Sequence, residues 1–246
     1  MKLILSSSPY QRVKRDTGQV MRLVIYAMVP GIIAQTVFFG WGTLIQAFLA
    51  VASALVFEGV ILWLRKRPIE RTLTDYSAIL TGLLIAISIP PTLPWWMTIT
   101  GVFFAIAVAK HVYGGLGHNI FNPAMAGYVV VLVAFPMYLN LWTAPRMGDI
   151  DYSYPTLYET LQYGLTGTLP DYLSFDAVSR ATPLDVVKSG LNDMRTFDEL
   201  RAYSLMGDFG GRGWEWIGNF IAMGGAWLLL KKIIRWQIPF AVLAGL

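Results

Sequence analysis

One threonine hydroxyl lies in a short polar run whose residue types could support a covalent attachment. The run around Thr182 reads DAVSRATPLD, residues 176–185. The same residues also predict a helix start, with Thr182 as N-cap, Pro183 at the first helical position and Asp185 two positions further on. From these residues alone, the helix start is the favoured interpretation, and chemistry at the hydroxyl is the alternative.

A second group of polar residues lies between two apolar stretches. Asn119 and Asn122 belong to the glycine-rich segment that follows Lys110, HVYGGLGHNIFNPAMAG. Non-helical backbone at membrane depth is tolerated where it is buried in protein or lines a cavity, and transporters use such broken helices to bind ligands or ions. Asn119 and Asn122 are therefore candidates for a polar lining inside the membrane. A cytoplasmic loop of turn residues explains the same spacing equally well.

One acidic side chain and two histidines are further candidates. Glu58 lies inside an apolar stretch, where an ionisable group is costly and indicates function. Its sequence neighbours supply no partner, and Arg65 follows about two helical turns later, so an ion path and a side chain that reaches toward the interface are both open. His111 and His118 have no acidic residue between them, and we expect no metal site there.

The elements that must position these groups are membrane helices. Of the 246 residues, 55% are hydrophobic and 14% are charged, whereas soluble domains have about 25% charged residues. Crossing the hydrocarbon core takes about 20 helical residues, and the chain has a series of apolar stretches near that length: 23–39, 44–64, 77–89, 95–109, 125–139 and 214–230, with another that starts near Trp236. This pattern predicts an all-α polytopic membrane protein with about six or seven transmembrane helices.

Basic residues set the expected orientation and exclude nucleic acid as the reason for the pI near 9.3. They cluster before the first stretch and after the second, fourth and sixth, at Lys2, Arg12, Lys14, Arg15, Arg22, Arg65, Lys66, Arg67, Arg71, Lys110, Lys231, Lys232 and Arg235. If the N-terminal leader is cytoplasmic, all of these clusters are cytoplasmic, as the positive-inside rule requires. The chain has no cysteine, so it supplies no thiolate ligand for a metal or an iron–sulfur cluster.

Four regions follow from this topology. Residues 1–22 are a cytoplasmic leader, 23–139 a five-span region, 140–213 an acidic extracytoplasmic insert, and 214–246 one span and the start of another. We expect the third span to be short or broken, because Pro90, Pro91 and Pro94 cannot continue a helix.

The sequence also predicts helices in the insert and a feature of the C-terminus. The insert should contain short helices near 183–189 and 196–204. The chain stops at Leu246 inside an apolar run, which leads us to expect that the C-terminal helices of the fold are missing.

The run D-x-x-S-x-A-T resembles the flavinylation motif of one membrane-protein family. That family comprises the D subunit of the Rnf ion-translocating electron-transport complex and the B subunit of the sodium-pumping NADH:quinone oxidoreductase. The segments GGLGHNIFNPAMAGY (114–128) and ILTGLLIAISIPPTLPWW (79–96), with the leader SSSPYQR, resemble the same family in the same order. The resemblance covers nearly the whole chain and reverses the preference at Thr182 in favour of a flavin.

The resemblance implies a cofactor and a set of residues. Thr182 would carry FMN through a phosphoester bond made by a dedicated flavin transferase, and Asp176, Ser179 and Ala181 fill the other motif positions. Arg180 could contact the phosphate. Family members also hold a non-covalent riboflavin or second flavin, whose residues the motifs do not identify. The fold implied is an inverted repeat of broken helices.

The resemblance also implies a role. The chain would pass electrons inside a bacterial inner-membrane complex that links ferredoxin and NAD to sodium or proton movement, together with iron–sulfur and other flavin-bearing subunits. It would hold no catalytic residue of its own. The alternative is a channel or transporter of broken-helix type without a redox role, because Asn122-Pro123-Ala124 is similar to the corner of water channels. That triplet is present once, whereas water channels have two.

Overall fold

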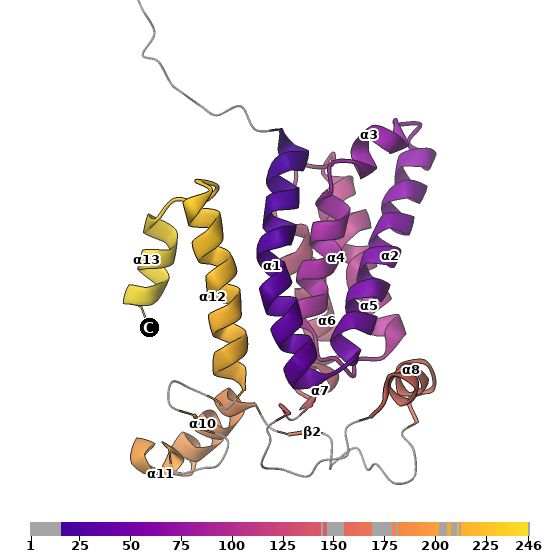
Figure 1. Ribbon diagram of the computed structural model, residues 1–246. Coiled ribbons are helices and arrows are strands. Elements are labelled where there is room, and N and C mark those ends of the chain that lie inside the picture. Colours follow the sequence, from indigo (N-terminus) through magenta and orange to yellow (C-terminus); the bar gives the residue numbers. More distant parts are fainter. Residues whose placement is uncertain are drawn as a thin grey trace, which may run out of the picture.

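A helical bundle forms most of the molecule (Figure 1). The computed structural model describes residues 16–143, 145–146, 155–168, 179–180, 182–201, 206–207, 211 and 213–245. The bundle consists of α1 (Thr17–Phe39), α2 (Gly42–Leu64), α3 (Ile69–Leu73), α4 (Ser77–Ser88), α5 (Trp95–Phe103), the π-helix η1 (Phe104–Val112), α6 (Pro123–Ala134) and α7 (Pro136–Leu139). The protein is an all-α polytopic membrane protein, which confirms the fold class predicted from composition.

Within the part of the chain that the structure describes, three helical stretches are long and apolar enough to cross a membrane: Thr17–Phe39, Gly42–Leu64 and Trp95–Val112. The apolar helices α4 and α6 have 12 residues each, which at a rise of 1.5 Å per residue is about 18 Å. Because the hydrocarbon core is roughly 30 Å thick, these two helices cover only part of it. α4 is the short third span that the prolines predicted, whereas α6 ends at Ala134, inside the stretch 125–139 that was expected as one span.

Glutamines from neighbouring helices satisfy backbone carbonyls around the break after α4. The Gln35 side-chain amide donates to the Ile87 carbonyl at 3.0 Å, and the Gln46 amide donates to the Leu93 carbonyl at 2.5 Å. Thr98 then donates to the Gln46 side-chain oxygen at 2.7 Å. Buried carbonyls without partners would be costly in this environment, so these contacts allow the proline-rich turn to lie within the bundle.

We name the two ends of the bundle by their side chains. The basic end has Arg22, Arg65, Lys66, Arg67, Lys231 and Lys232, at the start of α1 and the ends of α2 and α12. The aromatic end has Phe39, Trp95, Trp96, Trp142 and Trp214. All described residues of 142–213 lie beyond the aromatic end (Figure 1).

The described residues of the insert form three helices and a small sheet. The helices are α8 (Leu157–Thr166), α10 (Pro183–Asn192) and α11 (Phe197–Arg201). The sheet pairs β1 (Trp142–Thr143) with β2 (Ser179–Arg180) in antiparallel register, Trp142 opposite Arg180. The two helices predicted near 183–189 and 196–204 are present, whereas α8 was not predicted.

The chain returns to the bundle as α12 (Trp214–Leu230), which packs along α1, and α13 (Gln237–Ala244) follows. The contact with α1 is close because Gly224 has no side chain: a Cβ there would overlap the Ala27 carbonyl. At the aromatic end, Phe39 and Trp214 form an edge-to-face pair at 4.8 Å between ring centroids. This pairing ties the exit of α1 to the entry of α12.

Candidate functional site

Thr182 is the N-cap of α10. Its hydroxyl accepts a hydrogen bond from the Asp185 backbone amide at 3.3 Å and donates to the Asp185 carboxylate at 2.6 Å. Pro183 occupies the first helical position, and the backbone of Thr182 is extended. The helix start predicted from the sequence is therefore confirmed, and it holds the Thr182 oxygen at the N-terminus of a ten-residue helix.

The backbone before Thr182 is anchored to the bundle. β2 ends two residues earlier, and its partner β1 contains Trp142. The Trp142 ring lies 5.0 Å from that of Trp214 and 5.5 Å from that of Phe39, so three aromatic rings from α1, β1 and α12 meet at one point. The strand pairing therefore fixes the approach to Thr182 close to the aromatic end of the bundle.

The other positions of the flavinylation motif are described only in part. Ser179 and Arg180 form the backbone of β2, while their side chains, together with Asp176 and Ala181, lie outside the described part of the chain. Their predicted roles, including a contact between Arg180 and a phosphate, stay predictions.

The Thr182 position fits a phosphate-bearing cofactor. The first amides of a helix have no intrahelical acceptor and carry a partial positive charge, which favours anions. The Thr182 side chain is half-buried and so keeps part of its surface at the edge of the insert. An esterified phosphate at this oxygen would lie at the favourable end of α10.

Asn119 and Asn122 make local hydrogen bonds. The Asn119 oxygen accepts from the Gly117 amide at 3.2 Å, and its side-chain amide donates to the Phe121 carbonyl at 2.7 Å. The Asn122 oxygen accepts from the Ala124 amide at 3.0 Å and thereby caps α6. Both residues shape the turn that starts α6, and the predicted polar lining stays a prediction.

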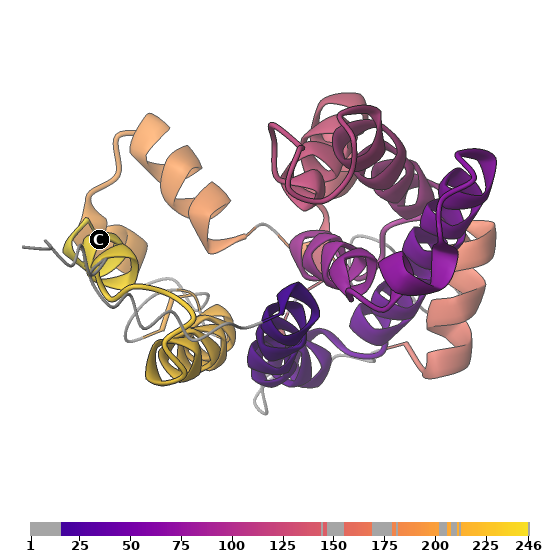
Figure 2. The same ribbon diagram turned by 90° about the horizontal axis from the view of Figure 1, so that it is seen from above.

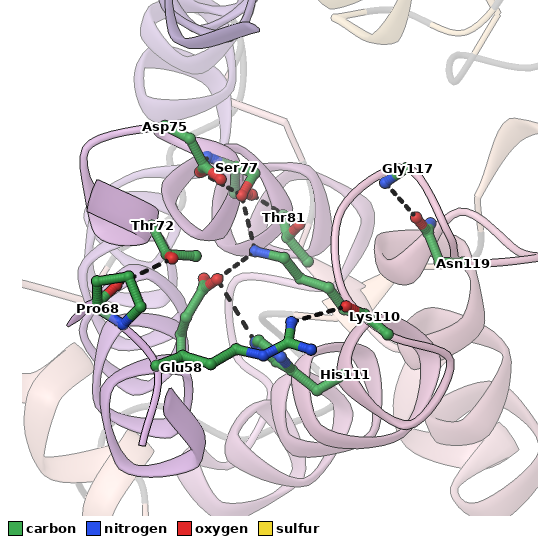
Figure 3. Close-up of polar contacts among 12 residues, drawn as sticks. Glu58, Pro68, Thr72, Asp75, Ser77, Thr81, Lys110, His111, Gly117 and Asn119 are labelled. Carbon is green, nitrogen blue, oxygen red and sulfur yellow. Dashed lines mark hydrogen bonds and ion pairs between the residues drawn. The ribbon is translucent and has the colours of Figure 1, made fainter. Parts of the chain in front are cut away.

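A cluster of buried charges lies inside the bundle near its basic end (Figure 3). Glu58 of α2 and Lys110 of η1 form an ion pair at 2.5 Å, with side chains 0% and 1% exposed. His111 is also buried, with its Nε2 atom 3.5 Å from the same Glu58 oxygen. Of the two alternatives for Glu58, reaching toward the interface is wrong, and Lys110, which the sequence placed with the basic residues that flank the spans, is buried inside the bundle.

Polar contacts continue from this cluster toward the basic end (Figure 3). The Lys110 ammonium donates to the Ser77 hydroxyl at 2.7 Å, and that hydroxyl donates to the Asp75 carboxylate at 2.5 Å. Asp75 is half-buried, and Arg65 donates to the His111 carbonyl at 2.7 Å. The groups form a continuous path from a partly exposed carboxylate to the buried Glu58.

Glu58 and His111 give this cluster groups that can exchange a proton. Glu58 Oε2 and His111 Nδ1 have no hydrogen-bond partner among the described atoms, and His111 Nε2 has the 3.5 Å contact with Glu58 and no closer one. Buried polar atoms without partners are rare and indicate strain, function or a bound water or ion. Sequence reasoning missed the arrangement because Glu58 and Lys110 are 52 positions apart. The signal in the sequence that pointed to this cluster was Lys110, a basic residue directly after the apolar stretch 95–109.

Comparison with known proteins identifies the family. Residues 4–246 match the family described as NQR2, RnfD, RnfE. The chain belongs to this family.

Named relatives of the NQR2, RnfD, RnfE family support the assignment. The chain is 45% identical over 250 residues to the D subunit of the ion-translocating oxidoreductase complex of Escherichia fergusonii, a match that covers 98% of this chain and 70% of the relative. It is 45% identical to the protein of the same name from Citrobacter koseri, with 98% and 71% covered, and 43% identical to that of Aliivibrio salmonicida, with 100% and 72% covered. The resemblance inferred from the motifs is confirmed.

Proposed function

We propose that this chain is the flavin-bearing membrane subunit of an ion-translocating oxidoreductase complex, with FMN esterified to Thr182. The position of Thr182 carries the proposal. Its oxygen lies in a family motif, at the N-terminus of α10, two residues after a strand that is anchored to the bundle. The relatives are named as subunits of an ion-translocating oxidoreductase complex, which supports the wider role.

The residues around Thr182 have separate tasks in this proposal. Asp185 holds the hydroxyl by accepting its hydrogen, and that hydrogen bond is given up when the oxygen is esterified. The amides at the start of α10 then face the phosphate. The FMN ring supplies the electron-accepting chemistry, while the protein supplies position and electrostatics. The paired strands keep this end of α10 near the membrane boundary.

The orientation follows from the charges at the two ends. We place the basic end in the cytoplasm of a bacterium and the insert on the opposite side of the inner membrane, because positive residues are retained in the cytoplasm. The FMN on Thr182 would then be extracytoplasmic, and the cluster around Glu58 would lie toward the cytoplasmic side.

The partners are other subunits of the complex. With no cysteine, this chain cannot bind an iron–sulfur cluster through thiolates, so the iron–sulfur centres belong to other subunits. Ferredoxin and NAD are the expected donor and acceptor of the whole complex, and a flavin transferase completes the maturation of this chain.

In-gel fluorescence tests the attachment. The full chain is co-expressed with a flavin transferase that is shown to modify another substrate in the same cells, and the denatured protein is viewed under ultraviolet light. We expect fluorescence from the wild type and none from Thr182→Ala. A fluorescent Thr182→Ala band, or a colourless wild type beside a modified control substrate, overturns the proposal.

A matched variant separates flavin attachment from helix capping. Thr156 caps α8 as Thr182 caps α10, and its hydroxyl accepts from the Glu159 amide at 3.4 Å. Thr156→Ala removes a similar cap from the same insert and leaves the motif intact. We therefore expect this variant to keep the fluorescence of the wild type.

Cysteine labelling tests the orientation, and the absence of native cysteine makes it simple. Lys66→Cys at the basic end and Lys188→Cys on α10 are exposed positions. In intact cells whose outer membrane is permeable to the reagent, a maleimide that cannot cross the inner membrane should label position 188 and leave position 66 unlabelled. The reverse pattern would contradict the topology.

A further inference from the structure

Helix α8 lies across the bundle axis at the aromatic end. Figure 1 shows α8 nearly end-on, while Figure 2, which looks along the bundle, shows its full length at the edge of the molecule beside α2. α8 also contacts α2. A helix perpendicular to the spans, at their end and outside their ring, has the orientation of a helix that lies in the plane of a membrane surface.

The side chains of α8 form three separate faces. Thr160 and Tyr163 are buried against the bundle. Residues four apart share one side of a helix, and Leu157, Leu161 and Leu165 are spaced in this way, with 45, 38 and 67% of their surface exposed. The next sector of the helix is exposed and more polar, and contains Tyr158, Gln162 and Thr166. The leucine face is therefore separate from both the face that packs on the bundle and the more polar sector.

The leucine face is fixed in place. Both partners of a capping box are present at the start of α8, where Thr156 and Glu159 bond to each other's backbone amides. Gly167 ends the helix in a left-handed conformation, φ 73°, which glycine adopts at low cost. With its ends set and Tyr163 buried, α8 cannot rotate to bury the leucines without giving up these contacts.

An aromatic pocket adjoins the second half of α8. It has a volume of about 640 Å³ and is lined by Trp95, Trp96, Tyr138, Tyr163 and Leu165, among others. Burial raises the pKa of the Tyr163 phenol, with a further contribution from Tyr138, so this phenol is neutral at physiological pH. Tryptophan and tyrosine are enriched at the boundary between lipid and water, and the pocket therefore lies at the depth expected for lipid headgroups.

The span that α8 contacts also exposes large apolar side chains. Phe48, Val56 and Trp63 are large exposed side chains on α2, the span that α8 contacts. Glu159 is the sole charged residue between 157 and 166, and its carboxylate bonds within the helix cap. Burial of apolar surface, and not attraction between charges, is thus the available driving force for binding.

We propose that α8 is an interfacial helix whose Leu157, Leu161 and Leu165 insert into the membrane leaflet at the aromatic end. This inference needs only the membrane bundle and does not rest on the flavin at Thr182. It gives the insert a second attachment to the membrane, beside the pairing of β1 with β2.

Single-cysteine spin labels test the proposal in the full chain, which has no cysteine of its own. Labels are placed at 161 and 165 on the leucine face and at 162 and 166 on the polar face, in nanodiscs of phosphatidylcholine. Phe48→Cys provides the lipid reference and Lys188→Cys the water reference. We expect labels at 161 and 165 to collide more with oxygen than with a nickel chelate, like the lipid reference at 48. Labels at 162 and 166 should collide more with the nickel chelate, like the water reference at 188.

Two outcomes overturn the proposal. Equal collision with the nickel chelate at all four positions shows that the leucine face lies in water. Leucine-face labels that become protected only after the other subunits of the complex are added show that a protein, and not lipid, covers α8. Because no charge drives the binding, replacing part of the phosphatidylcholine with an anionic lipid should leave the collision ratios unchanged.

Discussion

The bundle and the insert use polar side chains in opposite ways. In the bundle, the partners are distant in sequence: Lys110 reaches Glu58, and Gln46 reaches Leu93. In the insert, the partners are three residues apart: Thr156 with Glu159, Thr182 with Asp185, and Thr196 with Glu199. Polar contacts therefore hold the bundle together across helices, whereas in the insert they define where single helices begin.

This difference has an energetic consequence. Buried groups in the bundle have no water to replace a lost partner, so removing one partner leaves an uncompensated charge or amide. Exposed caps in the insert regain solvent when a partner is removed. We therefore expect mutations in the bundle to affect the whole protein and mutations in the insert to act locally.

The largest effect is expected at the buried ion pair. Lys110→Met or Glu58→Gln should each cost about 3–5 kcal/mol, because the remaining member is a buried charge without its partner. Thermal unfolding in detergent should show a midpoint lower by on the order of 10 °C. The double variant should recover most of this loss, since it removes both charges. Lys66→Met, an exposed change at the same end, is the control and should have little effect.

The contact between α12 and α1 of the bundle ranks next. Gly224→Val places a side chain against the Ala27 carbonyl, and overpacking of this kind costs about 1–3 kcal/mol. The thermal midpoint should fall by less than for Lys110→Met. A Cβ at the adjacent Gly225 meets no atom within 4 Å, so Gly225→Ala should be close to neutral. Equal losses for the two variants would show that α12 does not pack on α1 as described.

The cap of α10 should have a smaller and local effect. Thr182→Ala in protein without flavin removes the hydrogen bond to the Asp185 amide and should cost about 0.5–2 kcal/mol. Hydrogen exchange should become faster for residues 183–192, while exchange in α2 and α4 stays unchanged. Faster exchange throughout the bundle would contradict the separation between the two regions.

The smallest effect is expected at Glu199. Hydrogen bonds from the Thr196 backbone amide and hydroxyl lower the pKa of this carboxyl below its usual value. A carboxyl with a lowered folded pKa stabilises the folded state above its unfolded pKa of about 4.3, and this contribution is lost as pH falls through the folded value. An NMR titration of Glu199 should give a midpoint below that of a free glutamate, and Thr196→Ala should raise it.

The same contrast explains what could be read from the sequence. Short-range signals were sufficient to predict the start of α10, where Thr182, Pro183 and Asp185 lie within four positions. They were also sufficient to predict the break after α4, which Pro90 and Pro91 follow. Apolar length predicted the spans. The cluster of Glu58, Lys110 and His111 was missed because it depends on the packing of η1 against α2, which no local pattern specifies.

Helix α8 was missed for a different reason. Its start has a capping box at Thr156 and Glu159, and Leu157, Leu161 and Leu165 repeat at helical spacing. These signals are in the sequence, but the acidic insert was expected to form short helices near 183–189 and 196–204. In a segment of polar composition, a short amphipathic helix is recognised only when the spacing of its apolar residues is examined directly.

The central claim is that Thr182 is the site of covalent FMN, and peptide mass spectrometry tests it most directly. Protein matured with the flavin transferase is digested, and the peptide that contains residues 176–185 is fragmented. We predict an added mass of one FMN less one water on this peptide, with the fragment ions assigning it to Thr182. An unmodified peptide from protein that is yellow after denaturation, or a flavin assigned to another residue, would contradict the account.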